Sequence, residues 1–302
     1  PQPFRVPQGI SVGKEPLRRG GKLPNLTGDA PLAADSDLGL RPTRLLVSIR
    51  DAAEAMAALK AGVDWIDLKE PNHGSLGLPA PETAYEVAAR LADAGASARS
   101  SVALGELNEV RQQSNATISA YSSRFPVCKV GLAEAGPAWQ EDLDRLRSLV
   151  APSQLVPVHY ADFNECQGIA LPDIFDWLSR RESSQVESYR EAADALASGE
   201  APRVLIDTKL KDGRTLLDFY SVGELTEWRQ EGSMRGIQLL LAGSLDATAV
   251  LQLRQTGAEA IGVRGAVCKR ARNSSLSEQR LQNLVEQFNS ATDIFETRAV
   301  QP

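Results

Sequence analysis

Lysine and aspartate side chains recur at the ends of three short apolar runs. One run ends in Asp67 and Lys69, another in Asp207 and Lys211, and a third carries Lys129 among apolar neighbours. An amine that lies near other cations and is partly withdrawn from water has a lowered pKa, so it can attack a carbonyl as a Schiff-base nucleophile or act as a base. We predict that these five residues form a catalytic cluster in which the lysines supply the amine and the base while the aspartates hold cations and move protons.

Glycines after two later apolar runs predict a phosphate site. The first run leads to Gly243 and Ser244, and the second contains Gly262, Arg264 and Gly265. Glycine lets a phosphate approach backbone N–H groups, and an arginine adds a charge-assisted contact. The competing interpretation is that these glycines serve only tight turns.

The loop after Lys69 and the two histidines complete the candidate residues. Residues 72–77 are small and polar, as a turn that closes over a ligand requires, and Ser75 is our candidate substrate contact. His73 and His159 lack the i, i+4 spacing or the nearby cysteines and histidines of a metal site. We therefore predict no metal and no cofactor, and we expect His159 to be a hydrogen-bonded structural residue.

Eight β-branched or apolar runs alternate with segments of helical period, which is typical of repeated βα units around a parallel sheet. The strand candidates are residues 44–49, 65–71, 101–107, 126–132, 155–160, 203–210, 237–244 and 260–267. The helical candidates are residues 51–61, 81–94, 139–150, 173–198, 222–230, 246–255 and 277–290, with a short helix within 116–121 and Asp51 and Asp246 as N-caps.

This alternation predicts an α/β fold, a single (β/α)8 TIM barrel with an irregular N-terminal extension. An open Rossmann-like sheet is the competing fold, and the absence of GxGxxG after the first strand disfavours it. In a barrel, alternate strands share inward layers, so Lys69, Lys129 and Lys211 on the even-numbered strands are expected to converge. Period-two alternation also places Lys209 on the inward side with Asp207 and Lys211, although successive inward positions lie at different heights.

Composition limits the partners of this 302-residue chain. The net charge of −6 disfavours nucleic acid and anionic lipid, and no apolar stretch is long enough to cross a membrane. Three widely spaced cysteines favour a reducing, cytoplasmic setting. We expect an irregular extension at 1–42, a catalytic barrel at 43–292 and a tail at 293–302, acting on a small phosphorylated substrate, with a homo-oligomer left open.

Several short motifs, in their order along the chain, carry a resemblance to a known family. They are Leu46-Val47-Ser48, Asp67-Leu68-Lys69-Glu70-Pro71, Gly74-Ser75-Leu76-Gly77, Lys129-Val130-Gly131-Leu132, Tyr160-Ala161-Asp162, Asp207-Thr208, Lys211-Asp212-Gly213, Leu217-Asp218-Phe219, Leu241-Ala242-Gly243-Ser244 and Gly262-Val263-Arg264-Gly265-Ala266 with Cys268-Lys269. Across almost the whole barrel the chain resembles the (5-formylfuran-3-yl)methyl phosphate synthases, also called 4-(hydroxymethyl)-2-furancarboxaldehyde-phosphate synthases.

The resemblance implies a lyase of methanofuran-type cofactor biosynthesis that condenses two glyceraldehyde 3-phosphate molecules, with loss of phosphate and water. It also implies that Lys69 forms the Schiff base and Lys129 accepts a proton, with Asp67, Asp207 and Lys211 assisting. Strand periodicity alone does not rank Lys69 above Lys211 as the nucleophile. Two alternatives stay open, namely another class I aldolase-like enzyme on a different sugar phosphate, and a noncatalytic phosphometabolite-binding protein.

Overall fold

The computed structural model describes residues 42–151, 154–180 and 201–299, without the side chains of 291–299, and contains a closed barrel of eight parallel strands. Each strand pairs with its two neighbours in chain order, and β8 closes the barrel on β1. The strands are β1 (Arg44–Ile49), β2 (Trp65–Leu68), β3 (Ser100–Glu106), β4 (Val127–Gly131), β5 (Gln154–Tyr160), β6 (Arg203–Asp207), β7 (Gln238–Leu241) and β8 (Ala260–Val263). The predicted fold is confirmed, and the open Rossmann-like sheet is wrong.

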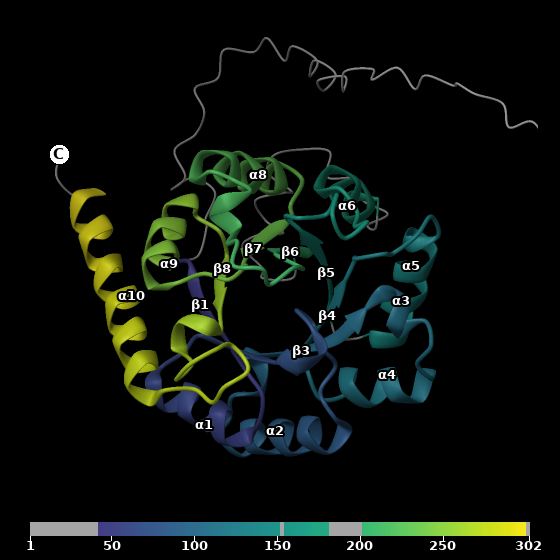
Figure 1. Cartoon of the computed structure of the whole chain (residues 1–302), viewed down its shortest axis with the longest axis horizontal. Helices are drawn as coiled ribbons and strands as arrows, with labels where there is room; N and C mark the ends of the chain where they lie inside the picture. The colour runs from purple at the N-terminus through teal and green to yellow at the C-terminus, as the bar shows by residue number, and fades with distance from the viewer. Residues whose placement is uncertain (1–41, 152–153, 181–200, 300–302) are drawn as a thin grey trace, which may run out of the picture. The chain divides into compact units, whose positions relative to one another are not determined.

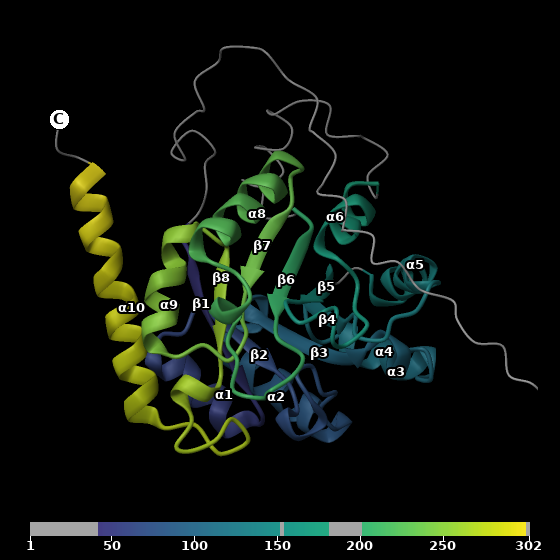
Figure 2. The same cartoon turned by 45° about the horizontal axis from the view of Figure 1, so that its top comes forward.

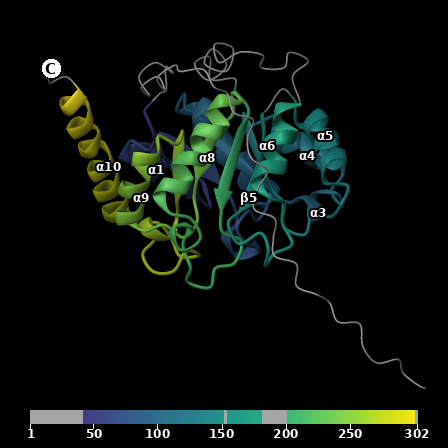
Figure 3. The same ribbon diagram turned by 90° about the horizontal axis from the view of Figure 1, so that it is seen from above.

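Helices form a layer outside the strands, which Figures 1 and 2 show around the barrel and Figure 3 shows from its side. They are α1 (Ala52–Ala61), α2 (Pro81–Asp93), α3 (Leu107–Val110), α4 (Asn115–Ser122), α5 (Trp139–Val150), α6 (Leu171–Ser179), α8 (Val222–Met234), α9 (Ala247–Leu253) and α10 (Glu278–Ala299). The short helix within 116–121 is confirmed as part of α4. Short 3-10 turns lie at Pro71–His73, Ser97–Arg99, Leu216–Asp218, Arg254–Thr256 and Gly265–Val267.

Local capping explains where two of these helices begin. Asp51 accepts a hydrogen bond from Glu54 N, and Asp246 accepts one from Ala249 N, each at 2.8 Å. A side-chain acceptor at this position satisfies an amide that has no partner within the helix. Both predicted N-caps are confirmed.

The predicted segment boundaries differ from the structure at several ends. Residues 1–41 of the expected extension, and 181–200 of the expected helix 173–198, lie outside the described residues. Helix α10 continues to Ala299, across the expected barrel end at 292. Strands β2, β6, β7 and β8 end three or four residues before the apolar runs do. These strand ends are wrong because the residues that follow leave the sheet, and Lys69, residues 242–244 and residues 264–266 line the cavity at the barrel mouth.

Two apolar layers hold the barrel together, one between strands and helices and one inside the strands. The inner layer includes Leu46, Ala103, Val156 and Leu205, and none of them is more than 4% exposed. Inward side chains alternate with outward ones, so the residue two positions after an inward apolar residue also points inward. This rule carries Ser48, Asp67, Lys129 and Asp207 to the carboxyl ends of the strands.

Candidate functional site

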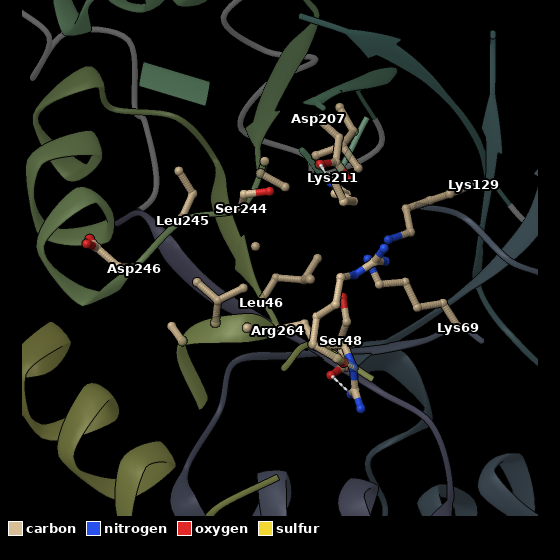
Figure 4. Close-up of a pocket in the computed structure, with 18 residues that line it drawn as sticks. Leu46, Ser48, Lys69, Lys129, Asp207, Lys211, Ser244, Leu245, Asp246 and Arg264 are labelled. Atoms are coloured by element: carbon tan, nitrogen blue, oxygen red, sulfur yellow. Dashed lines mark hydrogen bonds and ion pairs between the residues drawn. The ribbon is translucent and has the colours of Figure 1, made fainter. Parts of the chain in front are cut away.

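A cavity of about 310 Å³ lies at the carboxyl ends of the strands. Its walls come from strands on both sides of the barrel closure, and Figure 4 shows the amines of Lys69 and Lys129 pointing toward its centre. The lining residues are Leu46, Ser48, Lys69, Lys129, Leu205, Asp207, Lys211, Ala242, Gly243, Ser244, Leu245, Asp246, Gly262, Val263, Arg264, Gly265, Ala266 and Arg272. Five are cationic and two are carboxylates, so the cavity is suited to an anion in a chain whose net charge is −6.

Lys129 and Asp67 form a buried ion pair at the floor of the cavity. Lys129 Nζ lies 2.6 Å from Asp67 Oδ1, and the two side chains are 3% and 0% exposed. Asp67 also accepts hydrogen bonds from Ser48 Oγ at 3.0 Å and Ser101 Oγ at 2.7 Å. A buried carboxylate with three donors is held in one orientation, so it fixes the Lys129 ammonium beneath the cavity.

Lys69 is the first residue after β2, and its environment differs from that of Lys129. Among the described residues its Nζ has no hydrogen bond or ion pair. Burial lowers the pKa of Lys69 to about 7; Asp207 and Asp67 act to raise it, while Lys129 and Lys211 add to the lowering. At neutral pH a substantial fraction of Lys69 is therefore the free amine.

Lys211 and Asp207 form a second ion pair at the rim, where β6 leaves the sheet. Lys211 Nζ lies 3.1 Å from Asp207 Oδ1 and donates to the carbonyl and hydroxyl oxygens of Thr208 at 2.6 and 2.9 Å. Burial would raise the pKa of Asp207, but the ammonium groups of Lys211 and Lys69 outweigh burial and lower it. Asp207 is therefore an anion that faces the amine of Lys69.

Lys209, expected on the inward side with Asp207 and Lys211, lies over the ring of the inner-layer residue Tyr160 but does not line the cavity. Lys209 Nζ donates to Glu106 Oε1 at 2.7 Å, and Tyr160 Oη donates to the same oxygen at 2.6 Å. The physical reason is that β6 ends at Asp207, after which Asp162 accepts hydrogen bonds from Lys209 N and from the next amide. Period-two alternation does not apply beyond the last paired residue of a strand.

The glycine-rich segments after β7 and β8 line the opposite wall from β2 and β4. Gly243 and Ser244 have φ values of +124° and +52°, in the left-handed region, and this bend directs their backbone into the cavity. A Cβ at Gly262 would lie 3.3 Å from Ala242 Cβ and from Leu46 Cδ2, whereas one at Gly265 would meet nothing within 4 Å. Gly262 thus allows close packing, and Gly265 leaves open space beside the cavity.

Two predicted ligand contacts have their polar groups committed to the protein. The Arg264 guanidinium donates to Ser48 O, Glu54 Oε2 and the carbonyls of residues 272 and 274 at 2.6 to 3.0 Å. Ser75 is fully buried, and its hydroxyl donates to the carbonyls of Thr208 and residue 209. Arg264 lines the cavity, but its side chain stabilises the loop that follows it. Ser75 joins the loop after β2 to the loop after β6 and is not among the residues that line the cavity.

Sequence reasoning missed three residues of this site. Ser48 and Ser101 hold Asp67, and Ser48 lies two residues after the inward Leu46, so strand alternation was a signal that could have found it. Arg272 also lines the cavity, but it lies in the loop between β8 and α10, where no periodic pattern predicts direction.

His159 is a structural residue, as predicted. Its Nδ1 lies 2.9 Å from Ile169 O, its Nε2 lies 3.1 Å from Tyr220 Oη, and burial lowers its pKa to about 4. Within the described ranges, no group of three or more histidine, cysteine, aspartate or glutamate side chains is arranged to bind a metal. No helix in those ranges is long and apolar enough to cross a membrane.

The closed barrel, with polar side chains gathered at the carboxyl ends of its strands, defines a (β/α)8-barrel protein with an enzyme-type site. The model of the 4-HFC-P synthase family matches residues 45–285, and the chain belongs to this family of synthases. The family expected from the short motifs is confirmed.

Curated relatives from archaea carry the name (5-formylfuran-3-yl)methyl phosphate synthase. The protein of Methanococcus maripaludis strain C5 is 29% identical over 232 residues, covering 74% of this chain and 89% of the relative. The protein of Archaeoglobus fulgidus is 25% identical over 250 residues, covering 80% and 98% of the two chains. The chain is similar in fold to phosphoribosylanthranilate isomerase from Thermotoga maritima, with a TM-score of 0.51, 12% identity and coverage of 82% and 98%.

Proposed function

We propose that this chain condenses two molecules of glyceraldehyde 3-phosphate to (5-formylfuran-3-yl)methyl phosphate in methanofuran-type cofactor biosynthesis, through a Schiff base on Lys69. Membership of the 4-HFC-P synthase family and the names of the relatives support the product. The observation that carries the chemistry is the Lys69 amine, which lines the cavity with a pKa of about 7 and no ion-pair partner among the described residues.

In the proposed reaction, neutral Lys69 attacks the carbonyl carbon of one triose phosphate. A C–N bond forms, the carbonyl oxygen takes up two protons and leaves as water, and the resulting iminium acidifies the neighbouring C–H. Loss of that proton gives an enamine, whose carbon forms a bond to the aldehyde of the second triose. Water hydrolyses the iminium and releases Lys69, and ring closure with loss of one phosphate and two further waters then yields the furan. The water released when the iminium forms and the water that hydrolyses it cancel, so two trioses give one furan phosphate, one phosphate and two waters.

In this proposal two ion pairs move the protons. Lys129 is the proton acceptor of this proposal, and Asp67, whose Oδ1 lies 2.6 Å from Lys129 Nζ, holds it in position. At the rim, Asp207 faces Lys69 as an anion and Lys211 supplies an ammonium donor. Removing either pair would leave Lys69 able to form an iminium but slow to complete the condensation.

The backbone after β7 and β8 would hold a substrate phosphate. Gly243, Ser244 and Gly265 expose main chain to the cavity, and the nearby cations compensate the phosphate charge. Arg264 contributes by fixing the surrounding loop, because its side-chain donors already bind Glu54 and backbone carbonyls.

The experiment is incubation of the protein with glyceraldehyde 3-phosphate, followed by furan absorbance, phosphate release, and borohydride reduction with peptide mapping. We expect furan and phosphate in equal amounts and an adduct on Lys69. An adduct without furan would favour another aldolase-like reaction on a different sugar phosphate. Neither furan nor adduct would favour a phosphometabolite-binding protein.

Substitution tests the nucleophile separately. Lys69→Ala should abolish furan formation and the adduct while leaving the circular dichroism spectrum and thermal unfolding near those of the wild type. Lys60→Ala is the matched control, because Lys60 is 73% exposed on the outside of the barrel. Near-normal turnover by Lys69→Ala would overturn the assignment of Lys69.

A further inference from the structure

Arg272 is a cation of the cavity wall that the proposed reaction does not yet use. It comes from the loop between β8 and α10, is partly buried, and lines the same cavity as the three lysines. Its Nη2 donates to Gly74 O at 2.9 Å, and no carboxylate among the described residues pairs with it. A guanidinium has five N–H donors, so this single bond leaves donors free for an anion.

The backbone of the Arg272 loop is held rigidly in place. Arg264 Nε donates to Arg272 O at 2.6 Å, and Arg50 Nη1 donates to Asn273 O at 2.8 Å. Both arginines pair with Glu54, a buried residue of α1 that also accepts from the amide of residue 276. This network fixes the backbone that carries Arg272, and the bond to Gly74 O orients its guanidinium; such preorganisation reduces the entropy lost on binding.

Arg272 lies on a different side of the cavity from Gly243 and Ser244. Its hydrogen bond to Gly74 links the loop after β8 to the loop after β2, and β1 separates these two strands in the closed barrel. Gly243 and Ser244 follow β7, on the other side of β8. A phosphate on that glycine backbone therefore leaves Arg272 facing a second part of the ligand.

A partly buried guanidinium that binds no anion is energetically unfavourable, because burial removes part of its hydration. Burial lowers the pKa of Arg272 from its usual range, yet an arginine remains charged in proteins. Asp207 favours the charged form of Arg272 but makes no ion pair with it, so an anionic ligand would stabilise this partly buried cation further, and arginine binds phosphate through paired N–H donors.

We infer that Arg272 is the binding residue for a second phosphate, so that the cavity takes an occupant with two phosphates spaced across it. This inference rests on the proposed function, in which two triose phosphates or their six-carbon adduct occupy the site together. Arg272 holds the phosphate that is remote from Gly243 and Ser244, and the Arg50, Glu54 and Arg264 side chains act as positioning residues for it.

The test measures binding of two probes without a carbonyl, so that no Schiff base can form. The probes are mannitol 1,6-bisphosphate and sorbitol 6-phosphate, titrated by calorimetry into the wild type and into Arg272→Gln and Arg270→Gln. Arg270 is an exposed neighbour in the same loop, so its variant removes the same charge outside the cavity.

We expect the wild type to bind the bisphosphate at least tenfold more tightly than the monophosphate. Arg272→Gln should weaken bisphosphate binding about tenfold or more and leave monophosphate binding within about threefold, since a charge-assisted contact to only one phosphate is lost. Arg270→Gln should change neither, and Arg272→Lys should restore part of the lost affinity because it keeps the charge without the planar donors.

Equal weakening of both probes by Arg272→Gln, no weakening of either, or a wild type that binds neither probe would each overturn the inference. Failure of the proposed function has a different signature. In that case glyceraldehyde 3-phosphate gives no furan, while the bisphosphate still binds in an Arg272-dependent way.

Discussion

Substituting Asp207 or Lys211, the ion pair at the rim of the cavity, should shift the pKa of Lys69 in opposite directions. With a pKa of about 7, roughly half of the Lys69 side chains are neutral at pH 7. A lysine with the ordinary pKa of about 10.4 would be neutral in about one molecule in 2,500 at that pH. Burial and the neighbouring cations thus raise the concentration of reactive amine by about three orders of magnitude.

Asp207 raises the pKa of Lys69 and Lys211 lowers it, so the two substitutions have opposite signs. Asp207→Asn removes an attractive charge and frees Lys211 to repel Lys69, which should lower the Lys69 midpoint by about one pH unit. Lys211→Gln removes a repulsive charge and leaves Asp207 uncompensated, which should raise the midpoint by about one unit. Each variant keeps a side chain of similar size, so packing changes little.

Competitive labelling measures these midpoints without requiring turnover. A trace of acetic anhydride reacts with the neutral amine, and mass spectrometry of peptides gives the rate for each lysine from pH 5 to 10. Exposed Lys60 in the same sample corrects for reagent reactivity. A Lys69 midpoint near 10 in the wild type would refute the reasoning, as would a shift of both variants in the same direction.

Three further predictions concern the surroundings of the site. Asp67→Asn should lower the free energy of unfolding by about 3 to 5 kcal/mol, because it leaves the buried Lys129 ammonium without its counter-ion. Urea denaturation measures this loss, and the exposed Asp212→Asn is the control, whose urea midpoint should equal that of the wild type. His159 has a pKa of about 4 in the folded chain and about 6.5 in the unfolded chain. Its contribution to the free energy of unfolding is therefore fully present above pH 6.5, and about 3 kcal/mol of it is lost as the pH falls to 4. His159→Gln should flatten the plot of unfolding free energy against pH between these values, and an unchanged slope would contradict the argument. Gly243→Ala should lower the free energy of unfolding by about 1 to 3 kcal/mol and weaken the binding of inorganic phosphate, because φ at Gly243 is +124° and a Cβ there would lie 3.1 Å from Leu216 Cβ. Gly265→Ala is the control and should fold normally, because a Cβ at Gly265 meets no atom within 4 Å.

The fold and the floor of the site follow from local sequence patterns. Alternation of short apolar runs with helical segments determined the number and order of strands. Within a strand, side chains alternate between two faces, so Asp67 and Lys129 could be assigned to the inside from their spacing alone. Motifs at the strand ends determined the family, because they mark positions that face a shared cavity.

Tertiary structure decided which charged groups pair, because a charge's partner comes from another strand or loop. Lys129 pairs with Asp67 across the barrel interior, whereas Lys69 is left without a partner among the described residues, and this difference separates their chemistry. Beyond the last paired residue of each strand the alternation ends, so the turn of Lys209 toward Glu106 depended on the loop path. For the same reason, spacing within its own loop does not predict the place of Arg272 in the cavity, because long-range hydrogen bonds to Gly74 O and from Arg50 to Asn273 O set it.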